Sequence, residues 1–278
     1  MNDKILYGYT HSGKFHADDV FSSALLKYLY PDIKIRRCKK APEPSENSII
    51  FDIGMGKFDH HQPDAEVREN GVPYAAFGLL WRHFGKQIVN EHNFLHFDEN
   101  FVQPLDSNDN TGEKELLAYA VSLFNPVWDS KQSADSAFEQ AVDMAYDLLS
   151  KVFDKYKAEE RAKEQVLEAY KNSTDGVVIL DRYMPYKTAL DKTDADFVVY
   201  PSNRGGYCIT NVTKENGEKK FPEQWRGLEN SELIRISGID RLRFCHKSGF
   251  LIAAETLESC IKAAEKAVWV ERIKNTNK

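Results

Sequence analysis

The sequence Phe51-Asp52-Ile53-Gly54, followed shortly by Phe58-Asp59-His60-His61-Gln62, decides how the rest of the chain is interpreted. The first stretch closes an apolar run, which predicts a buried strand with the aspartate near its carboxyl end. Open α/β sheets bind their ligands at that end of their strands. Glycine then permits a tight turn, after which the chain presents an acid and two imidazoles. Adjacent side chains of an extended segment point to opposite sides, so we expect His60 and His61 to have different roles.

A second group of potential ligands lies upstream, in the segment 11–19, which reads His-Ser-Gly-Lys-Phe-His-Ala-Asp-Asp. It follows an apolar stretch that predicts a first strand over 5–10, and it precedes an amphipathic pattern that predicts a helix over 19–29. Imidazole and carboxylate donors without cysteine suit Mn²⁺, Fe²⁺, Co²⁺ or Zn²⁺ better than Ca²⁺. Because one of two adjacent aspartates can cap the helix, we expect Asp18 to bind metal and Asp19 to cap the helix or support a ligand.

The order of predicted elements indicates two α/β domains joined by helices. Strand, helix, strand, loop and strand over 5–53 are typical of a Rossmann-like domain with a mainly parallel sheet. The stretch 133–171 contains neither proline nor glycine and predicts a pair of helices. Apolar runs beyond it predict a smaller α/β domain, with strands at 177–180, 197–200, 207–212, 243–246 and 250–254 and a helix over 256–268. We therefore predict a metal-binding catalytic domain over 1–125, a helical connector over 126–174 and a substrate-binding domain over 175–278.

Two further aspartates, Asp106 and Asp109, lie in a polar stretch that ends in Asn-Thr-Gly at residue 112. Three residues apart, they face the same side of the chain if this stretch is helical. An Asx-rich turn is the alternative. The residues by themselves leave open which of the two binds a metal.

Taken in order, these residues resemble the DHH phosphoesterase superfamily, whose motifs are a His-x-x-x-Asp-x-Asp loop, a strand-end Asp, Asp-His-His and a later Asp. Four phrases resemble a narrower branch, the melanocyte-proliferating-gene family, long labelled as metal-dependent protein hydrolases. They are Thr-His-Ser-Gly-x-Phe-His-x-Asp-Asp-Val, Phe-Asp-His-His-Gln, Phe-Pro-Glu-x-Trp-Arg-Gly-Leu and His-x-Ser-Gly-Phe. The first motif departs from the superfamily pattern, because it is one residue longer and has His16 where Asp is usual.

The resemblance implies a dinuclear metal centre with Asp52 as the bridging ligand. The residues that it assigns to the first ion are His11, His16 and Asp52, and those that it assigns to the second are Asp18, Asp52, His60 and Asp106, with Asp109 as the competing choice. Mn²⁺ is the metal expected at both positions, and Mg²⁺, Co²⁺, Fe²⁺ and Zn²⁺ are the alternatives.

The resemblance also implies an activity and two catalytic roles. His61 would donate a proton to the phosphoryl or leaving oxygen, and Asp59 would orient a histidine. The implied enzyme is a metal-dependent 3′-to-5′ exoribonuclease or oligonucleotide phosphodiesterase. Peptide cleavage is not expected, because the chain has neither a Gly-x-Ser-x-Gly nor a His-Glu-x-x-His motif.

Two glycine-containing turns in the C-terminal part are candidates for substrate binding. Arg204-Gly205-Gly206 offers a guanidinium group and closely approachable backbone N–H groups for a phosphate or carboxylate. His246, Ser248 and Gly249 form a second polar turn. Ordinary hairpins are the alternative for both. Trp225 either stacks on a base or packs in the core.

Composition narrows the substrate and the setting. The net charge of −6 lacks the basic footprint of a protein that grips long nucleic acid, so we expect a short RNA, an oligonucleotide or a nucleotide phosphate ester. No apolar run approaches the ~20 residues of a membrane span, and no signal core precedes the first strand, so we expect a cytoplasmic protein without membrane contact. Four cysteines without a Cys-x-x-Cys motif predict reduced thiols.

Two other functions and one assembly remain open at this stage. The acidic balance slightly favours a small-molecule phosphatase or pyrophosphatase that uses the same metals. A metal-stabilised protein that binds nucleotide or RNA without turnover is the alternative from outside the enzymes. The sequence also leaves a homodimer open.

Overall fold

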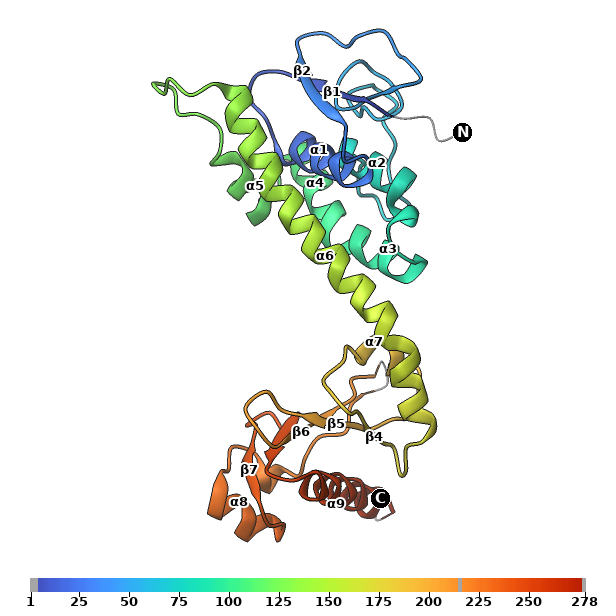
Figure 1. Ribbon diagram of the computed structural model, residues 1–278, viewed down its shortest axis with the longest axis vertical. Helices are drawn as coiled ribbons and strands as arrows, with labels where there is room; N and C mark the ends of the chain where they lie inside the picture. Colours follow the sequence, from blue (N-terminus) through green and yellow to red (C-terminus); the bar gives the residue numbers. More distant parts are fainter. Residues whose placement is uncertain (1–4, 215–216, 277–278) are drawn as a thin grey trace. The chain divides into compact units, whose positions relative to one another are not determined.

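The computed structural model describes residues 5–214 and 217–276, and its contacts divide the chain into two compact units, 1–156 and 157–278 (Figure 1). Each unit has a sheet and a hydrophobic core of its own. The expected mixed α/β class is confirmed. The finer division at residues 125 and 174 stays a prediction. No helix in the described ranges is both long enough and apolar enough to cross a membrane.

The sheet of the first unit is parallel throughout. It contains β1 (Tyr7–His11), β2 (Lys34–Cys38) and β3 (Ser48–Ile50) in the order β2-β1-β3. Parallel neighbours need a crossover, and α1 (Ala17–Leu29) provides it between β1 and β2. Because β1 is the central strand, the residues that follow β1 and β3 come together at one edge of the sheet.

Helices complete the first unit. They are α2 (Ala76–Phe84), a 3₁₀ turn (Gly85–Gln87), α3 (Glu91–Phe97), a π-type turn (Asp98–Val102), α4 (Gln103–Thr111) and α5 (Leu116–Ser122). Their buried faces meet the apolar side chains of α1 in a single core rich in aromatic residues. The rings of Trp81 and Phe97 lie 4.6 Å apart between centroids at its centre. The polar stretch that contains Asp106 and Asp109 is therefore helical, and it ends at Gly112 with a left-handed φ of 74°.

The prediction of a helical pair over 133–171 is wrong, because α6 (Ala134–Lys171) is one continuous helix of 38 residues. Its early apolar residues, such as Phe138 and Phe153, are buried in the core of the first unit. Its later ones, Ala162 and Val166, are buried in a core of the second unit. The charged stretch between these sets consists mainly of Lys, Glu, Arg and Ala, which favour helix, so nothing interrupts the backbone hydrogen bonds.

The second unit contains a mixed sheet of order β4-β5-β6-β8-β7. Its strands are β4 (Val177–Ile179), β5 (Phe197–Pro201), β6 (Tyr207–Asn211), β7 (Leu242–Cys245) and β8 (Leu251–Ala254). Only β4 and β5 are parallel among these pairs. The remaining elements are α7 (Lys187–Leu190), a 3₁₀ turn (Glu223–Trp225), α8 (Asn230–Ser237) and α9 (Leu257–Thr276).

Buried side chains settle two expectations for this unit. Trp225 is 2% exposed and belongs to the core, so it packs and does not present its ring to a base. All four cysteines are free thiols. Burial raises the pKa of Cys245 to about 11 and that of Cys260 to about 12, which keeps both thiols protonated and unreactive at neutral pH.

Two neighbouring glycines before β6 allow a matched test of how closely the backbone there approaches the end of β8. A Cβ on Gly206 would lie 2.2 Å from the carbonyl oxygen of Ala254, whereas a Cβ on Gly205 would meet nothing within 4 Å. Both residues have positive φ, so each alanine costs about 1 kcal/mol from conformation alone. We expect Gly205→Ala to lower the free energy of unfolding by about 1 kcal/mol and Gly206→Ala by about 3 kcal/mol, measured by urea denaturation. Equal losses would show that the close approach to Ala254 carries no energy.

Candidate metal centre

The site is built around Asp52, which lies two residues beyond Ile50, the last residue of β3. Tyr9 in β1 pairs with Ile50 in β3, so His11 and Asp52 each lie two residues beyond a matched pair. Asp52 takes a left-handed φ of 54°, which aspartate tolerates better than most residues. Its N–H donates to the carbonyl oxygen of Phe58 at 2.9 Å. That bond closes the loop 52–58 and returns the Asp-His-His segment to the end of the strand.

The two carboxylate oxygens of Asp52 face two different histidines. Oδ2 lies 3.2 Å from Nε2 of His11, and Oδ1 lies 3.4 Å from Nε2 of His60. Burial raises the pKa of Asp52, but the interactions with His11 and His60 outweigh it and hold the pKa below its ordinary value. One ionised carboxylate therefore joins both halves of the site.

His11, Asp19 and Asp52 form the first group of donors, whose ligand atoms all lie within 4.8 Å of one another. Oδ1 of Asp19 accepts the N–H of His16 and caps α1, as expected, while Oδ2 lies 3.3 Å from Nε2 of His11. The hydrogen bond with Asp52 is the main cause that raises the pKa of His11 to about 9. Burial raises the pKa of Asp19 to about 7. Asp19 thus combines the capping role with a place in the donor group.

Asp18, His60 and Asp109 form the second group. Nε2 of His60 lies 3.3 Å from Oδ2 of Asp109 and 3.9 Å from Oδ2 of Asp18. Burial lowers the pKa of His60, but Asp109 and Asp52 outweigh it and raise the pKa to about 11. Burial, then repulsion from Asp52 and Asp109, raises the pKa of Asp18 well above its ordinary value. The Asp18 carboxylate also accepts the N–H groups of Ala76 at 3.0 Å and Phe77 at 2.6 Å, which fixes the start of α2.

Asp59 and His61 form a hydrogen-bonded pair beside these groups. Oδ1 of Asp59 accepts from the backbone N–H of His60 at 2.8 Å and lies 2.7 Å from Nδ1 of His61. Its Oδ2 accepts the N–H of Met55 at 2.6 Å. Burial raises the pKa of Asp59, but the bond to His61 and the backbone donors outweigh it, so the pKa lies below its ordinary value. Asp59 is therefore ionised at neutral pH and sets the orientation of the His61 ring.

The expectation that His60 and His61 point to opposite sides is wrong. Their ring centroids lie 4.4 Å apart, because the segment turns around the Asp59 carboxylate and is not extended. Their environments nevertheless differ, since the side chain of His60 is 5% exposed and that of His61 is 58% exposed. Together with Asp52 they form a third potential donor group.

The structure distinguishes between the two aspartates of α4. Oδ2 of the fully buried Asp106 lies 2.8 Å from Nη2 of Arg68, and its Oδ1 accepts the N–H of Gly78. Asp106 lies outside all three donor groups, and the competing choice, Asp109, lies in the second. His16 also lies outside the groups. Its side chain is 54% exposed, with Nδ1 3.8 Å from Asp109.

A cavity of about 720 Å³ opens over the donor groups. Its lining residues come from four segments of the first unit, namely His11, Lys14, His16, Asp52, Ile53, Gly54, Met55, Asp59, His61, Asn108 and Asp109. Sequence reasoning did not single out Lys14 or Met55. It also missed Asn110, whose Oδ1 lies 3.0 Å from Nδ1 of His60. The available signal for Asn110 was its position four residues after Asp106, on the same face of the helix that this stretch forms.

The predicted substrate-binding residues of the second unit lie in two separate turns. Arg204, Gly205 and Gly206 precede β6 and lie near Ala254, the last residue of β8. His246, Ser248 and Gly249 lie in the turn between β7 and β8, just before the first residue of β8. Nδ1 of His246 lies 2.7 Å from Oγ of Ser248, and Gly249 packs against Arg226. The two turns are at opposite ends of the strands, so they do not form one pocket. Their roles stay predictions.

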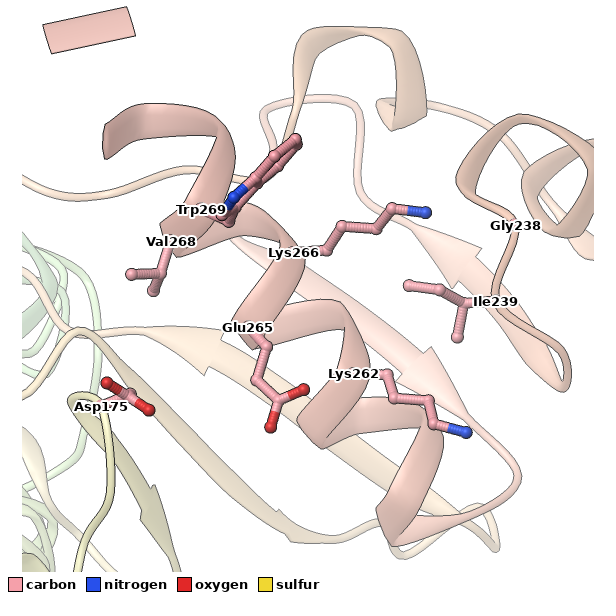
Figure 2. Close-up of a pocket in the computed structure, with 8 residues that line it drawn as sticks. All are labelled: Asp175, Gly238, Ile239, Lys262, Glu265, Lys266, Val268 and Trp269. Carbon is pink, nitrogen blue, oxygen red and sulfur yellow. The ribbon is translucent and has the colours of Figure 1, made fainter. Parts of the chain in front are cut away.

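Figure 2 shows a separate cavity of about 550 Å³ in the second unit, beside α9. Trp269, Lys262 and Lys266 line it, together with the segment after α8. Lys266 donates to the carbonyl oxygen of Ser237 and Lys262 to the carboxylate of Glu258. Both ammonium groups are thus engaged within the unit, and we assign this cavity no role.

The donor groups of the first unit fit divalent metal ions. Two of their buried atoms, Oδ2 of Asp19 and Nε2 of His60, have no well-oriented hydrogen-bond partner. Repulsion from neighbouring carboxylates is one cause of the raised pKa of Asp18. A bound cation would relieve this repulsion. Oxygen and imidazole nitrogen donors suit Mn²⁺, Mg²⁺, Co²⁺, Fe²⁺ and Zn²⁺ without selecting among them.

Comparison with known proteins confirms the narrower family that the sequence motifs resemble, over most of the chain. Residues 8–268 match a family model described as an uncharacterised protein family, UPF0160, with the short name MYG1 exonuclease. A MYG1 protein of Schizosaccharomyces pombe is 27% identical, with 93% of this chain and 96% of the relative covered. The MYG1 exonuclease of Homo sapiens is 26% identical over 92% and 84%, and a MYG1 protein of Chlamydia pneumoniae 28% over 91% and 93%. No solved structure matches the sequence significantly.

Metal binding is expected to release protons. In the metal-free site the pKa of His11 is about 9 and that of His60 about 11, so both rings carry a proton at pH 7 that a metal must displace. We expect at least two protons released per protein at pH 7, because the carboxyl groups of Asp18 and Asp19 are also raised in pKa, and an affinity for Mn²⁺ that rises with pH up to about 11. Titration calorimetry in buffers of different ionisation enthalpy measures both. A binding heat that is the same in every buffer would contradict this assignment of ligands.

Proposed function

The chain belongs to the MYG1 exonuclease family, and from this premise we propose that it is a divalent-metal-dependent phosphodiesterase that shortens RNA or short oligonucleotides from the 3′ end. The observation that carries the proposal is the Asp52 carboxylate, whose two oxygens face His11 and His60. A carboxylate shared by two donor groups supports a dinuclear centre of the kind that cleaves phosphodiesters. The name exonuclease of the human and mouse relatives supports the same class of reaction.

We infer that His11, Asp19 and Asp52 hold one metal and that Asp18, His60 and Asp109 hold the other, with Asp52 shared. When bound there, such ions supply Lewis-acid chemistry, in which they activate water and neutralise charge on the phosphate. The protein's own contribution is to keep these donors in place. Asn110 fixes the His60 ring through Nδ1, and His16 fixes Asp19 through its backbone N–H.

His61 is the side chain best placed to move a proton. Asp59 engages its Nδ1, which leaves Nε2 as the ring nitrogen that can meet substrate in the cavity. The Asp59 carboxylate holds the ring in one orientation, from which Nε2 can pass a proton to the phosphoryl or leaving oxygen. The cavity of about 720 Å³ accommodates a nucleotide-sized group, and Lys14 in its wall can meet a phosphate oxygen.

Hydrolysis of a 5′-labelled RNA of eight to twelve nucleotides in Mn²⁺ tests the proposal. We expect a ladder of products that shorten from the 3′ end, and a rate at least about 100-fold lower for Asp52→Asn and for His60→Ala. His92→Ala, on an exposed histidine of α3, is the matched control and should keep the wild-type rate.

Other outcomes would assign the site differently. Wild-type rates in both site variants would contradict the proposed centre. Cleavage of pyrophosphate or nucleoside monophosphates but not of RNA would favour a small-molecule phosphatase. Binding of RNA without hydrolysis in any of the candidate metals would favour a binding protein.

Asp59→Asn separates the role of His61 from metal binding. The asparagine side chain keeps one acceptor but loses the negative charge that faces Nδ1 of His61. We expect kcat to fall by about 10- to 100-fold, while KM and the Mn²⁺ affinity from calorimetry change little. If the Mn²⁺ affinity falls in step with kcat, Asp59 acts on the metal ligands and not on a proton donor.

A further inference from the structure

Trp128 is the most exposed large apolar side chain in the described part of the chain, at 96% exposure. It lies in the connection between α5 and α6, at the second position of a turn. The N–H of Ser130 donates to the carbonyl oxygen of Val127 at 2.9 Å and closes this turn. Tryptophan is mostly buried on average because its ring carries a large apolar area. Its exposure here is informative because the connection that carries it is attached to the loop that contains His11 and His16.

Two hydrogen bonds tie this connection to the loop that carries the metal-site histidines. The N–H of Phe15 donates to Oδ1 of Asn125 at 3.1 Å, and Nδ2 of Asn125 donates to the carbonyl oxygen of Phe15 at 2.9 Å. Phe15 lies between Lys14 and His16, which both line the cavity. Trp128 is three positions after Asn125 along the chain, a distance that spans at most about 11 Å. Stacked bases lie about 3.4 Å apart, so a strand that leaves the cavity reaches the indole within a few nucleotides.

The other end of the connection is attached to the same loop. Arg37 donates from Nη2 to the carbonyl oxygen of Gly13 at 2.5 Å and from Nη1 to Asp135, in the first turn of α6, at 2.8 Å. Its guanidinium carbon lies 4.6 Å from the centre of the Phe138 ring. The segment that presents Trp128 is therefore attached to the ligand loop on both sides, which limits how far the indole can lie from the cavity.

We propose that Trp128 is a stacking platform for a nucleobase of single-stranded RNA whose 3′ end occupies the cavity. The inference rests on the proposed function and identifies where the upstream part of its substrate is held. Stacking on an aromatic ring requires no positive charge, so it suits a chain with a net charge of −6. Lys14, which lines the cavity and directly precedes the Phe15 that contacts Asn125, can meet an intervening phosphate.

A second copy of the chain is the competing occupant of this surface. Leu116, Tyr119 and Leu123 on and after α5 are also exposed, at a spacing that suits packing between helices. The attachment of Trp128 to the ligand loop favours the nucleobase, and the experiment includes the alternative.

The chain offers its own reporter and its own control. Trp81 and Trp225 are buried, whereas Trp128 and Trp269 are exposed, the latter at 60% beside the cavity of the second unit (Figure 2). Titration with a phosphorothioate oligoadenylate of eight nucleotides in Mn²⁺, followed by tryptophan fluorescence, measures stacking before hydrolysis. We expect quenching in the wild type, and loss of the quench with a Kd about tenfold higher in Trp128→Ala. Trp128→Phe should keep most of the affinity, and Trp269→Ala should keep both the quench and the Kd.

Two results would overturn the inference. One is an unchanged quench and Kd in Trp128→Ala. The other is a dimer in sedimentation that Trp128→Ala converts to a monomer with unchanged RNA affinity, which would assign the surface to a second copy. The result also separates this inference from the proposed function. Trp128-dependent quenching without hydrolysis supports the platform while the phosphodiesterase fails, whereas hydrolysis that is indifferent to Trp128 overturns the platform alone.

Discussion

The constraint on which the first unit depends is the burial of several carboxylates within a few ångströms of one another. The cost of burying each carboxylate is offset by a different interaction. Asp52 faces two histidines, Asp18 accepts two N–H groups at the start of α2, and Asp19 caps α1. Asp106 pairs with Arg68. Without these partners the like charges would be prohibitively costly to bury, so the same contacts that form the helix ends also make the donor groups possible.

The parallel sheet explains why residues far apart in sequence meet here. β1 and β3 are hydrogen-bonded neighbours, and His11 and Asp52 each lie two residues beyond their last matched pair, Tyr9 and Ile50. The loop 52–58 closes on Phe58 and brings His60 to the other oxygen of the same carboxylate. The packing of helices completes the site, because α1 and α4 add Asp18 and Asp109 from outside the sheet.

Sequence reasoning therefore predicted best what local pattern and sheet topology control. The places of His11 and Asp52 at or just beyond the ends of β1 and β3 follow from short segments, whereas the pairing of Asp59 with a histidine was implied only by the family resemblance. The choice between Asp106 and Asp109 could not, because it depends on Arg68, which is distant in sequence and occupies one of them. The environment of Asp18 depends likewise on where α2 begins. The apposed rings of His60 and His61 result from a turn around Asp59 that alternation could not predict.

The same crowding of carboxylates has a consequence for substrate binding. In the function that we propose, bound divalent ions would offset the charge of these carboxylates, which otherwise disfavours the phosphates of RNA at the cavity. A contact that works by stacking does not need this offset, because it acts on the bases and is indifferent to the charge of the site. In an acidic protein, the stacking contact that we propose for Trp128 can hold a strand in position whether or not the charge of the donor groups has been neutralised.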